Sequence, residues 1–279
     1  MTFSIIGYDP ETEALGIAVQ SKFIGVGAVV PWAKAGVGAV ATQSFANPAY
    51  GQDGLKLMAE GKSAEETIDI ITANDDGKEY RQVGIMDATG HAATFTGNKC
   101  YDWAGGMVGE YCVAQGNILV QEEVVTSMIN TFEQETGKLA DRLLKALDAG
   151  QEAGGDRRGK QAAALLVVRE KGGYLQANDR MIDLRVDEHP DPIKELTRIY
   201  KLHRLYFGVT KKENILNVSD VRTEIVNHLY RRGFLLSKHV SDQDLNTALG
   251  TFHHVENFEG RELGHGKIDK EVLEFLTSS

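Results

Sequence analysis

Apolar residues alternate with a period of two near the start of the chain. Phe3 and Ile5 lie on one side of residues 2–8, a pattern that is typical of a β-strand. The next stretches keep this period but are apolar on both faces, which indicates strands of a sheet that is covered on both sides. We expect the first strands over residues 2–8, 14–22, 26–30 and 37–43.

The period changes to helical spacing after residue 52. Leu55, Met58 and Ala59 fall on one side of a helix predicted over residues 53–60. Ser63 and Glu66 match a capping box, which begins a second helix. Later strands are predicted over residues 81–87, 91–96, 111–120, 162–169 and 181–186, and helices over residues 122–133 and 139–149.

The predicted order is strands, a helix pair, strands, a second helix pair and strands. Two sheets packed face to face, each covered outside by a helix pair, bury all of these apolar faces. We therefore expect an α+β domain over residues 1–190, built as a four-layer αββα sandwich. A Rossmann fold would need strands and helices that alternate singly and a strand-GxGxxG-helix unit, which this sequence lacks.

Pro190 and Pro192 mark a domain boundary, and the spacing after them is mostly helical. The pattern predicts helices over residues 193–206, 220–232 and 242–252, and a last helix that begins near Asp269. We expect a small all-α domain over residues 201–279, near the lower end of the sizes that fold alone.

The charge of the chain argues against one class of partner. The formal net charge is −10, and residues 200–279 hold 11 Lys+Arg and 11 Asp+Glu, so the acidic excess lies in the first domain. An acidic domain repels phosphate backbones. We therefore expect no nucleic-acid partner.

The cysteines and the apolar runs predict a cytoplasmic protein. Cys100 and Cys112 are the only cysteines, which is too few for a disulfide framework and fits a reducing compartment. The apolar run over residues 24–41 is broken by Pro31 and several glycines, so we interpret it as core strands and expect no membrane span. The residues before Asp9 lack the pattern of a signal peptide.

Thr2 is the strongest candidate for chemistry. An α-amine has a pKa of about 7.7–8.0 against about 10.4 for a lysine, so far more of it is free base at neutral pH. Removal of Met1, which the small Thr side chain permits, would therefore give one residue both a nucleophile and its general base. The hypothesis is hydrolysis of an amide. The rival is a catalytically silent ligand-binding protein in which Met1 stays in place.

Seven blocks of the sequence, in order, resemble a known family. They are MTFSI from Met1, VQSKF from Val19, GAVVPWA from Gly27, GVGAVATQ from Gly36, NPAYG from Asn47, QGN from Gln115 and GGDRRG from Gly154. The stretch from residue 1 to about 188 is thereby identified as a member of the domain of unknown function 1028 (DUF1028) family. This resemblance implies an N-terminal nucleophile (Ntn) hydrolase-like fold, and amide hydrolysis by fold analogy alone.

By this resemblance Thr2 stands at the position of an Ntn nucleophile. Polar residues at the ends of nearby strands become candidates to assist it. They are Lys22 and Asn117 for catalysis, and Ser21, Gln43, Ser44 and Asn47 for substrate binding or an oxyanion hole. Lys22 would lower the effective pKa of the nucleophile or hold an anion. Each residue also has a plainer interpretation as a solvated strand end, a turn-former or a cap.

The glycine loop from Gly154 to Gly159 carries Asp156, Arg157 and Arg158. Two arginines there would bind a carboxylate in bidentate fashion, which favours an acidic amide or a small peptide as substrate. The alternative is a helix C-cap followed by a salt bridge. No metal or other cofactor is expected, because the first domain has neither an HExxH nor a CxxC motif.

The second domain has a resemblance of its own. LHRLYFG from Leu202, VENFEGR from Val255 and Ile268-Asp269 are similar to a peptidoglycan-binding-like domain that is often fused to this family. The resemblance implies binding of peptidoglycan fragments, which conflicts with the absence of an export signal. We therefore interpret this region as a small helical interaction module, for soluble muropeptides or for contacts within a homo-oligomer.

Overall fold

A computed structural model of the chain describes residues 2–278, which divide into two compact units, Met1–Thr197 and Arg198–Ser279. The strands of the first unit are β1 (Thr2–Asp9), β2 (Ala14–Ser21), β3 (Pro31–Lys34), β4 (Gly38–Ser44), β5 (Arg81–Asp87), β6 (Ala92–Thr96), β7 (Gly105–Gly109), β8 (Cys112–Asn117), β9 (Ala162–Val168) and β10 (Arg180–Val186). Its helices are α1 (Ala49–Ala59), α2 (Ala64–Ala73), α3 (Glu123–Gln134) and α4 (Leu139–Glu152). Helix α5 (Pro192–Phe207) follows, and the division between the units falls within it.

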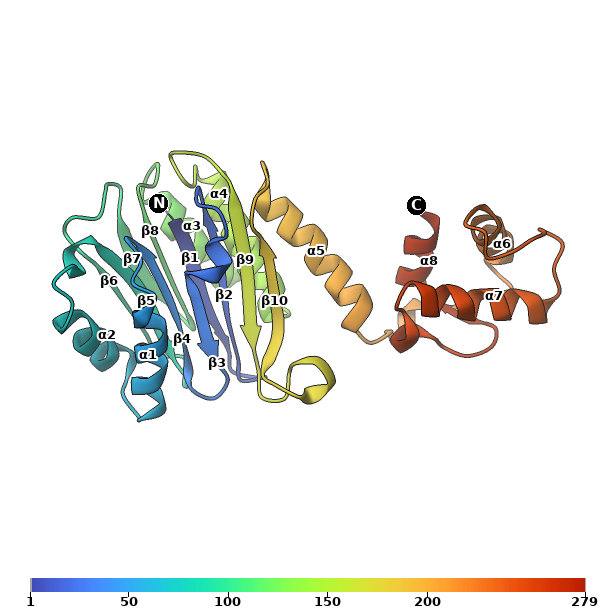
Figure 1. The fold of residues 1–279 in the computed structure, drawn as a ribbon, viewed down its shortest axis with the longest axis horizontal. Helices are drawn as coiled ribbons and strands as arrows, with labels where there is room; N and C mark the ends of the chain where they lie inside the picture. The colour runs from blue at the N-terminus through green and yellow to red at the C-terminus, as the bar shows by residue number, and fades with distance from the viewer. Residues whose placement is uncertain (1, 279) are drawn as a thin grey trace. The chain divides into compact units, whose positions relative to one another are not determined.

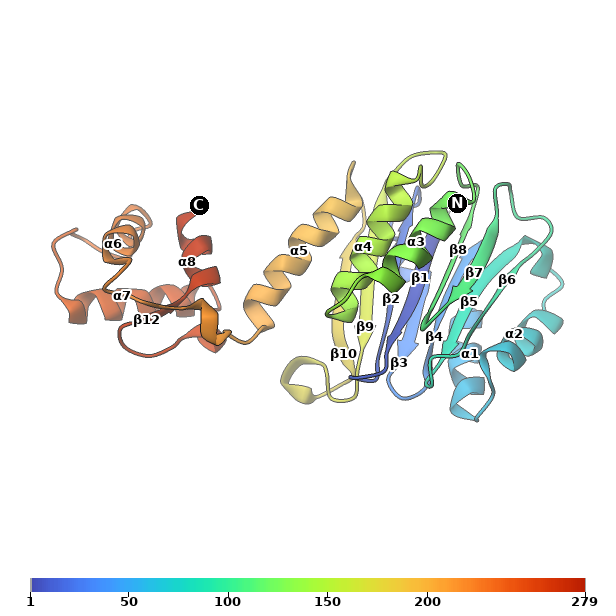
Figure 2. The same cartoon turned by 180° about the vertical axis from the view of Figure 1, so that it is seen from behind.

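The first unit is a sandwich of two antiparallel sheets. The larger sheet has the order β10-β9-β2-β1-β8-β7 and the smaller one β3-β4-β5-β6. Helices α1 and α2 cover the outer face of the smaller sheet (Figure 1), and α3 and α4 cover the outer face of the larger one (Figure 2). The predicted four-layer αββα order is confirmed.

Strand β1 lies in the middle of the larger sheet, between β2 and β8. Its alternation decides which side chains face the second sheet. Ile6 packs between the sheets with Ile17 of β2 and Ala41 of β4, so Thr2 and Ser4, which share its face, also point between the sheets. The start of β1 is thereby directed at the smaller sheet, and this direction places the candidate site.

Gly7 and Gly16 form one cross-strand pair on the opposite face of this sheet. A Cβ built on Gly7 would lie 2.6 Å from the ring of Phe132, and one on Gly16 would lie 2.5 Å from Leu143. Helices α3 and α4 can therefore approach the sheet closely only because both positions lack a side chain.

We expect Gly7→Ala to destabilise the protein by about 1–3 kcal/mol, because the added methyl overpacks a filled core. Equilibrium urea unfolding measures the change. Gly260→Ala is the matched control, since a Cβ there meets nothing within 4 Å. Equal effects of the two substitutions would contradict close packing at Gly7.

The strands of the first unit differ from the prediction in two places. The strand expected over residues 26–30 is a 3-10 helix, η1 (Val26–Ala28), and the strand follows it as β3. Gly25 begins this turn in the left-handed region, with φ 65°, and Pro31 is tolerated at the first position of an edge strand. Strand β7 was not predicted, because its glycines weaken the period-two pattern that indicates a strand.

The second unit is mostly helical, with α6 (Arg222–Arg231), α7 (Asp242–Val255), α8 (Lys270–Thr277) and the short strands β11 (Ile215–Asn217) and β12 (Lys267–Asp269). The remaining 3-10 helices of the chain are η2 (Lys78–Tyr80), η3 (Tyr174–Gln176), η4 (Lys212–Asn214) and η5 (Glu259–Arg261). The expectation of an all-α domain is therefore corrected by one small antiparallel strand pair. These strands were missed because each has three residues, too few to show a period.

Phe252 and Phe258 are the largest side chains in the core of the second unit, and both are fully buried. None of the helices within residues 2–278 has the length and the apolar character needed to cross a membrane.

Candidate functional site

Thr2 is the first described residue, and β1 holds it between the last residues of two other strands. It pairs with Ser21 of β2 on one side and with Asn117 of β8 on the other. Its side chain is almost buried, and its Oγ1 lies 3.0 Å from the Ser21 Oγ. The two hydroxyls therefore share a hydrogen bond at one edge of the space between the sheets.

A cavity of about 320 Å³ opens at this point. Five of the predicted site residues line it, namely Thr2, Ser21, Gln43, Ser44 and Arg158. The rest of its wall was not predicted and consists of Phe23, Val26, Val29, Val30, Phe45, Ala46 and Arg81. The structure thus brings half of the ten predicted site residues together around one space.

A network of buried side-chain amides binds the backbone of Thr2 through hydrogen bonds. Gln43 Nε2 donates to the Thr2 carbonyl oxygen at 3.2 Å, and Asn117 Nδ2 donates to the same oxygen at 3.5 Å. Both amides also donate to Gln82 Oε1, at 2.8 and 2.9 Å. Ser4 adds a hydrogen bond of 2.6 Å to Gln43 Oε1. Because their amide groups make these hydrogen bonds, Gln43 and Asn117 position Thr2.

Lys22 and Asn47 do not line the cavity. The Lys22 Nζ donates to the carbonyl oxygen of Lys160 at 3.2 Å on the exposed surface. The Asn47 amide lies 3.4 Å from an Asp75 oxygen and lines a different groove, between α1 and α2. The roles predicted for these two residues stay predictions that the geometry does not support.

Of the three predicted site residues on the glycine loop, only one lines the cavity. Asp156 is buried, and its carboxylate accepts hydrogen bonds from the backbone amides of Lys22 and Arg158 at 2.9 and 2.8 Å. It also forms an ion pair of 3.4 Å with the Arg158 guanidinium. Arg157 is exposed, and its backbone amide donates to the Ile118 carbonyl oxygen. Asp156 therefore fixes the loop, and Arg158 reaches the cavity without Arg157.

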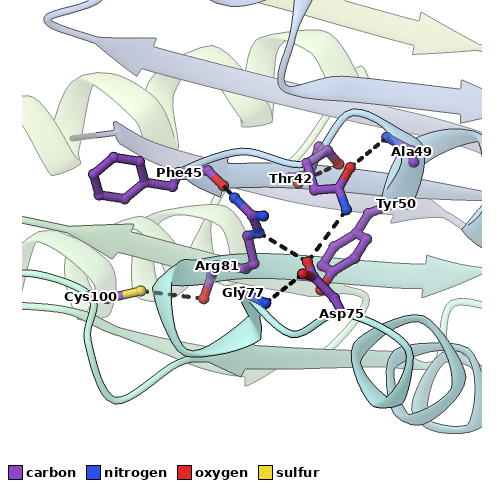
Figure 3. A network of polar contacts seen from close by, with 9 residues as sticks. Thr42, Phe45, Ala49, Tyr50, Asp75, Gly77, Arg81 and Cys100 are labelled. Atoms are coloured by element: carbon purple, nitrogen blue, oxygen red, sulfur yellow. Dashed lines mark hydrogen bonds and ion pairs between the residues drawn. The ribbon is translucent and has the colours of Figure 1, made fainter.

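Arg81 is the residue of the site that sequence reasoning missed. It begins β5, and the register pairs it with Ser44 at the end of β4. Its Nε donates to Asp75 at 3.0 Å and its Nη1 to the Phe45 carbonyl oxygen at 2.5 Å (Figure 3). No local pattern in the sequence marks it, because its place in the site depends on the pairing of β4 with β5.

Asp75 is an acid surrounded by hydrogen-bond donors. Tyr50 Oη donates to it at 2.9 Å and the Gly77 backbone amide at 2.7 Å, besides Arg81 and Asn47 (Figure 3). The hydrogen bond from Arg81 is the main reason that the pKa of Asp75 falls to about 2. Burial beside this carboxylate raises the pKa of the Tyr50 hydroxyl.

We expect Asp75→Asn to lower the stability at pH 7 by about 1–2 kcal/mol, because a depressed pKa makes the ionised carboxylate a stabilising group. This contribution is present above the unfolded pKa and is lost as pH falls toward about 2. Urea unfolding between pH 7 and pH 2 should therefore show a weaker acid dependence in the variant. Asp183→Asn is the control, since its ion pairs are more exposed and should contribute less than about 1 kcal/mol.

The cysteines do not take part in the candidate site. Both are buried and free, and neither lines the cavity. Burial raises the pKa of the Cys112 thiol to about 12, which leaves it protonated at neutral pH and therefore a poor nucleophile. Within residues 2–278, no group of three or more His, Cys, Asp and Glu side chains is arranged to hold a metal ion.

Two antiparallel sheets between two helix pairs define a four-layer αββα domain, with a cavity beside the start of its central strand β1. The profile of the family of unknown function DUF1028 matches residues 2–196, and that of a family described as "Putative peptidoglycan binding domain" matches residues 208–276. The chain therefore belongs to the DUF1028 family, and the predicted membership is confirmed.

One solved structure supports this membership, and two others are more distantly similar. A crystal structure of a DUF1028 protein from Silicibacter pomeroyi is 32% identical, and the match covers 73% of this chain and 86% of that chain with a TM-score of 0.68. An Anbu Gly-1 mutant from Hyphomicrobium sp. strain MC1 matches at 11% identity over 76% and 99% of the two chains, with a TM-score of 0.39. Anbu (ancestral beta-subunit) from Yersinia bercovieri matches at 9% over 72% and 94%, with a TM-score of 0.36. No curated protein matches the chain.

Proposed function

We propose that the first unit is an Ntn-type amidohydrolase that cleaves a small amide or peptide bond with Thr2 as nucleophile. The observation that carries this proposal is the almost buried Thr2 hydroxyl, 3.0 Å from the Ser21 hydroxyl, on the wall of a cavity of about 320 Å³. A nucleophile that is held in one orientation beside a concave space meets the geometric requirement for attack on a bound carbonyl.

The reaction has two halves. Thr2 Oγ1 bonds to the carbonyl carbon of the amide while the Thr2 amine accepts the hydroxyl proton. The tetrahedral intermediate then breaks its carbon–nitrogen bond, and the proton passes from the Thr2 amine to the departing amine. Water, deprotonated by the same Thr2 amine, then attacks the ester carbonyl; the bond from this carbon to Thr2 Oγ1 breaks, the acid leaves, and the amine returns the proton to Oγ1. Gln43 and Asn117 support both halves, because they fix the backbone from which Thr2 acts.

This proposal requires removal of Met1, which lies outside the described residues. The test is the intact mass of protein made without an N-terminal tag. We expect the mass of a chain that begins at Thr2. A retained Met1 in the native protein would overturn the nucleophile role and leave the catalytically silent ligand-binding protein as the better account of the cavity.

We also propose that the second unit binds peptidoglycan fragments, which is the role that the family description of residues 208–276 suggests. Support comes from a cavity of about 440 Å³ between residues of α5 and α8, lined by Arg198, Lys201, Leu202, Arg204, Leu205, Glu271, Glu274, Phe275 and Ser278. Its mix of basic, acidic and apolar side chains suits a peptide that carries charges of both signs.

Calorimetric titration of the full chain with a soluble muropeptide tests this second role. We expect Lys201→Glu to weaken binding and Lys212→Glu, outside the cavity, to leave it unchanged. No binding by the wild-type protein would exclude the proposal.

The compartment and the assembly state follow as further proposals. The free, buried Cys100 and Cys112 favour a reducing cytoplasm, whereas peptidoglycan binding favours a place outside it, and cell fractionation decides between them.

Exposed Phe23, Ile24 and Phe45 near the cavity favour a homo-oligomer. Light scattering during size-exclusion chromatography measures the assembly state.

A further inference from the structure

The cavity beside Thr2 combines a positive charge with an apolar wall. Arg81 and Arg158 are its charged lining residues, and no acidic residue lines it within the described part of the chain. Phe23, Val26 and Phe45 contribute apolar surface. A ligand that matches this wall has an apolar body and a negatively charged group.

Each of the two arginines pairs with a carboxylate that is not among the lining residues of the cavity. Asp75 pairs with Arg81 and Asp156 pairs with Arg158, at 3.0 and 3.4 Å, and neither acid lines the cavity. The lining of the cavity therefore carries two cationic side chains and no carboxylate.

Arg81 is held more firmly than a surface arginine. Its side chain is 24% exposed, and its Nε and Nη1 are bound to Asp75 and to the Phe45 carbonyl oxygen. Asp75 is in turn fixed by Tyr50 and by the Gly77 amide (Figure 3). A planar guanidinium that is oriented before binding loses little entropy when it binds an anion. The side chain of Arg158 is more exposed, at 44%.

We propose that this cavity recognises a carboxylate on an apolar body, with Arg81 as the fixed binding residue and Arg158 as a second, more exposed one. Planar carboxylates suit a guanidinium because two parallel N–H···O bonds can form. The inference rests on the proposed function only in calling this ligand the substrate, an amide that carries a free carboxylate. Asp75 is then a positioning residue that acts through Arg81.

Binding of two matched probes tests the proposal on the full-length protein. The probes are 3-phenylpropionate and 3-phenylpropanol, which share the apolar body and differ in charge. We expect the carboxylate to bind at least about tenfold tighter, a difference of about 1.4 kcal/mol, and the preference to shrink as salt rises from about 0.02 to 0.5 M. Equal affinities in the wild-type protein would overturn the inference.

Arginine variants then show which side chain is responsible for the preference for the carboxylate. Arg81→Met should reduce the ratio of the two affinities to within about threefold, whereas Arg157→Met should leave it unchanged, because that side chain is exposed and lies outside the lining. Arg158→Met should give an intermediate loss. A full preference retained in Arg81→Met would exclude Arg81 as the binding residue.

Two further measurements separate binding from folding and from catalysis. Arg81→Lys keeps the positive charge but lacks the two parallel N–H donors of a guanidinium, so it should retain part of the preference for the carboxylate. Circular dichroism shows whether each variant is folded. If Arg81→Met does not fold, Arg81→Lys and Arg158→Met still decide the point, since an undiminished preference in both would contradict the proposal. Neither probe contains an amide bond, so the result does not depend on whether Thr2 hydrolyses amides.

Discussion

Replacement of Thr2 by alanine is expected to lower the kcat/KM for amide hydrolysis on the order of 10³-fold or more, because loss of a nucleophile removes the covalent route entirely. Thr2→Ser should keep measurable turnover, since serine retains both the hydroxyl and the α-amine. The measurement is the initial rate of amine release from a library of small amides, with protein whose mass shows that Met1 is absent.

The Thr2 series has an internal control. Ser21→Ala removes the hydroxyl that lies 3.0 Å from Thr2 Oγ1 but leaves the nucleophile in place, so we expect a smaller loss than in Thr2→Ala. Binding of 3-phenylpropionate should survive in both variants, which shows that the cavity is intact. Turnover by Thr2→Ala at the wild-type rate would exclude Thr2 as the nucleophile.

The sequence predicted the layers of the first unit because each layer leaves a period. Strands that are covered on both sides, such as β2 and β4, are apolar on both faces, while the capping box at Ser63 and Glu66 marks the beginning of α2, as the structure shows. Where the period was weak, as in the glycine-rich β7 or at the turn before Pro31, the prediction failed.

The candidate site was only half predictable, and the reason is again the period of a strand. Consecutive residues along an extended chain point to opposite faces, so Ser21, the last residue of β2, lines the cavity while Lys22, the next residue, does not. A motif such as VQSKF identifies the end of the strand but does not show which residue faces inward. The register between strands decides that.

Arg81 illustrates what local sequence cannot supply. Its place in the cavity depends on the pairing of β4 with β5, which sets Arg81 opposite Ser44 across 37 positions of the chain. Such pairings are long-range and leave no mark in the spacing of nearby residues. Asp75 fixes Arg81 through a loop whose sequence predicts only a turn.

The residues that carried the resemblance of the second unit turn out to hold it together. Arg261 is 2% exposed and Asp269 fully buried, and their ion pair measures 2.7 Å. Arg261 also donates to the carbonyl oxygens of Leu205 and Arg204 at 2.9 and 2.8 Å, and to Glu271 at 3.0 Å. One side chain thus joins η5 to the end of α5 and to the beginning of α8.

We expect Arg261→Met to destabilise the second unit by about 3–5 kcal/mol, because it leaves the Asp269 charge buried without a partner. Asp269→Asn in the same chain should recover part of this loss, since it removes the charge while the amide oxygen can still accept from the Glu271 backbone, as the carboxylate does at 2.7 Å. Urea unfolding with hydrogen exchange of residues 198–278 measures the change.

Arg222→Met is the matched control for this prediction. Arg222 pairs with Asp242 at 2.6 Å, but that carboxylate is 89% exposed, so the loss should be under about 1 kcal/mol. Both substitutions remove one positive charge, but Arg261→Met leaves a buried carboxylate without its partner and Arg222→Met leaves an exposed one. The difference between them therefore measures the effect of burial. If Arg261→Met costs no more than Arg222→Met, water reaches Asp269, and the ion pair is not what fixes α5 against α8.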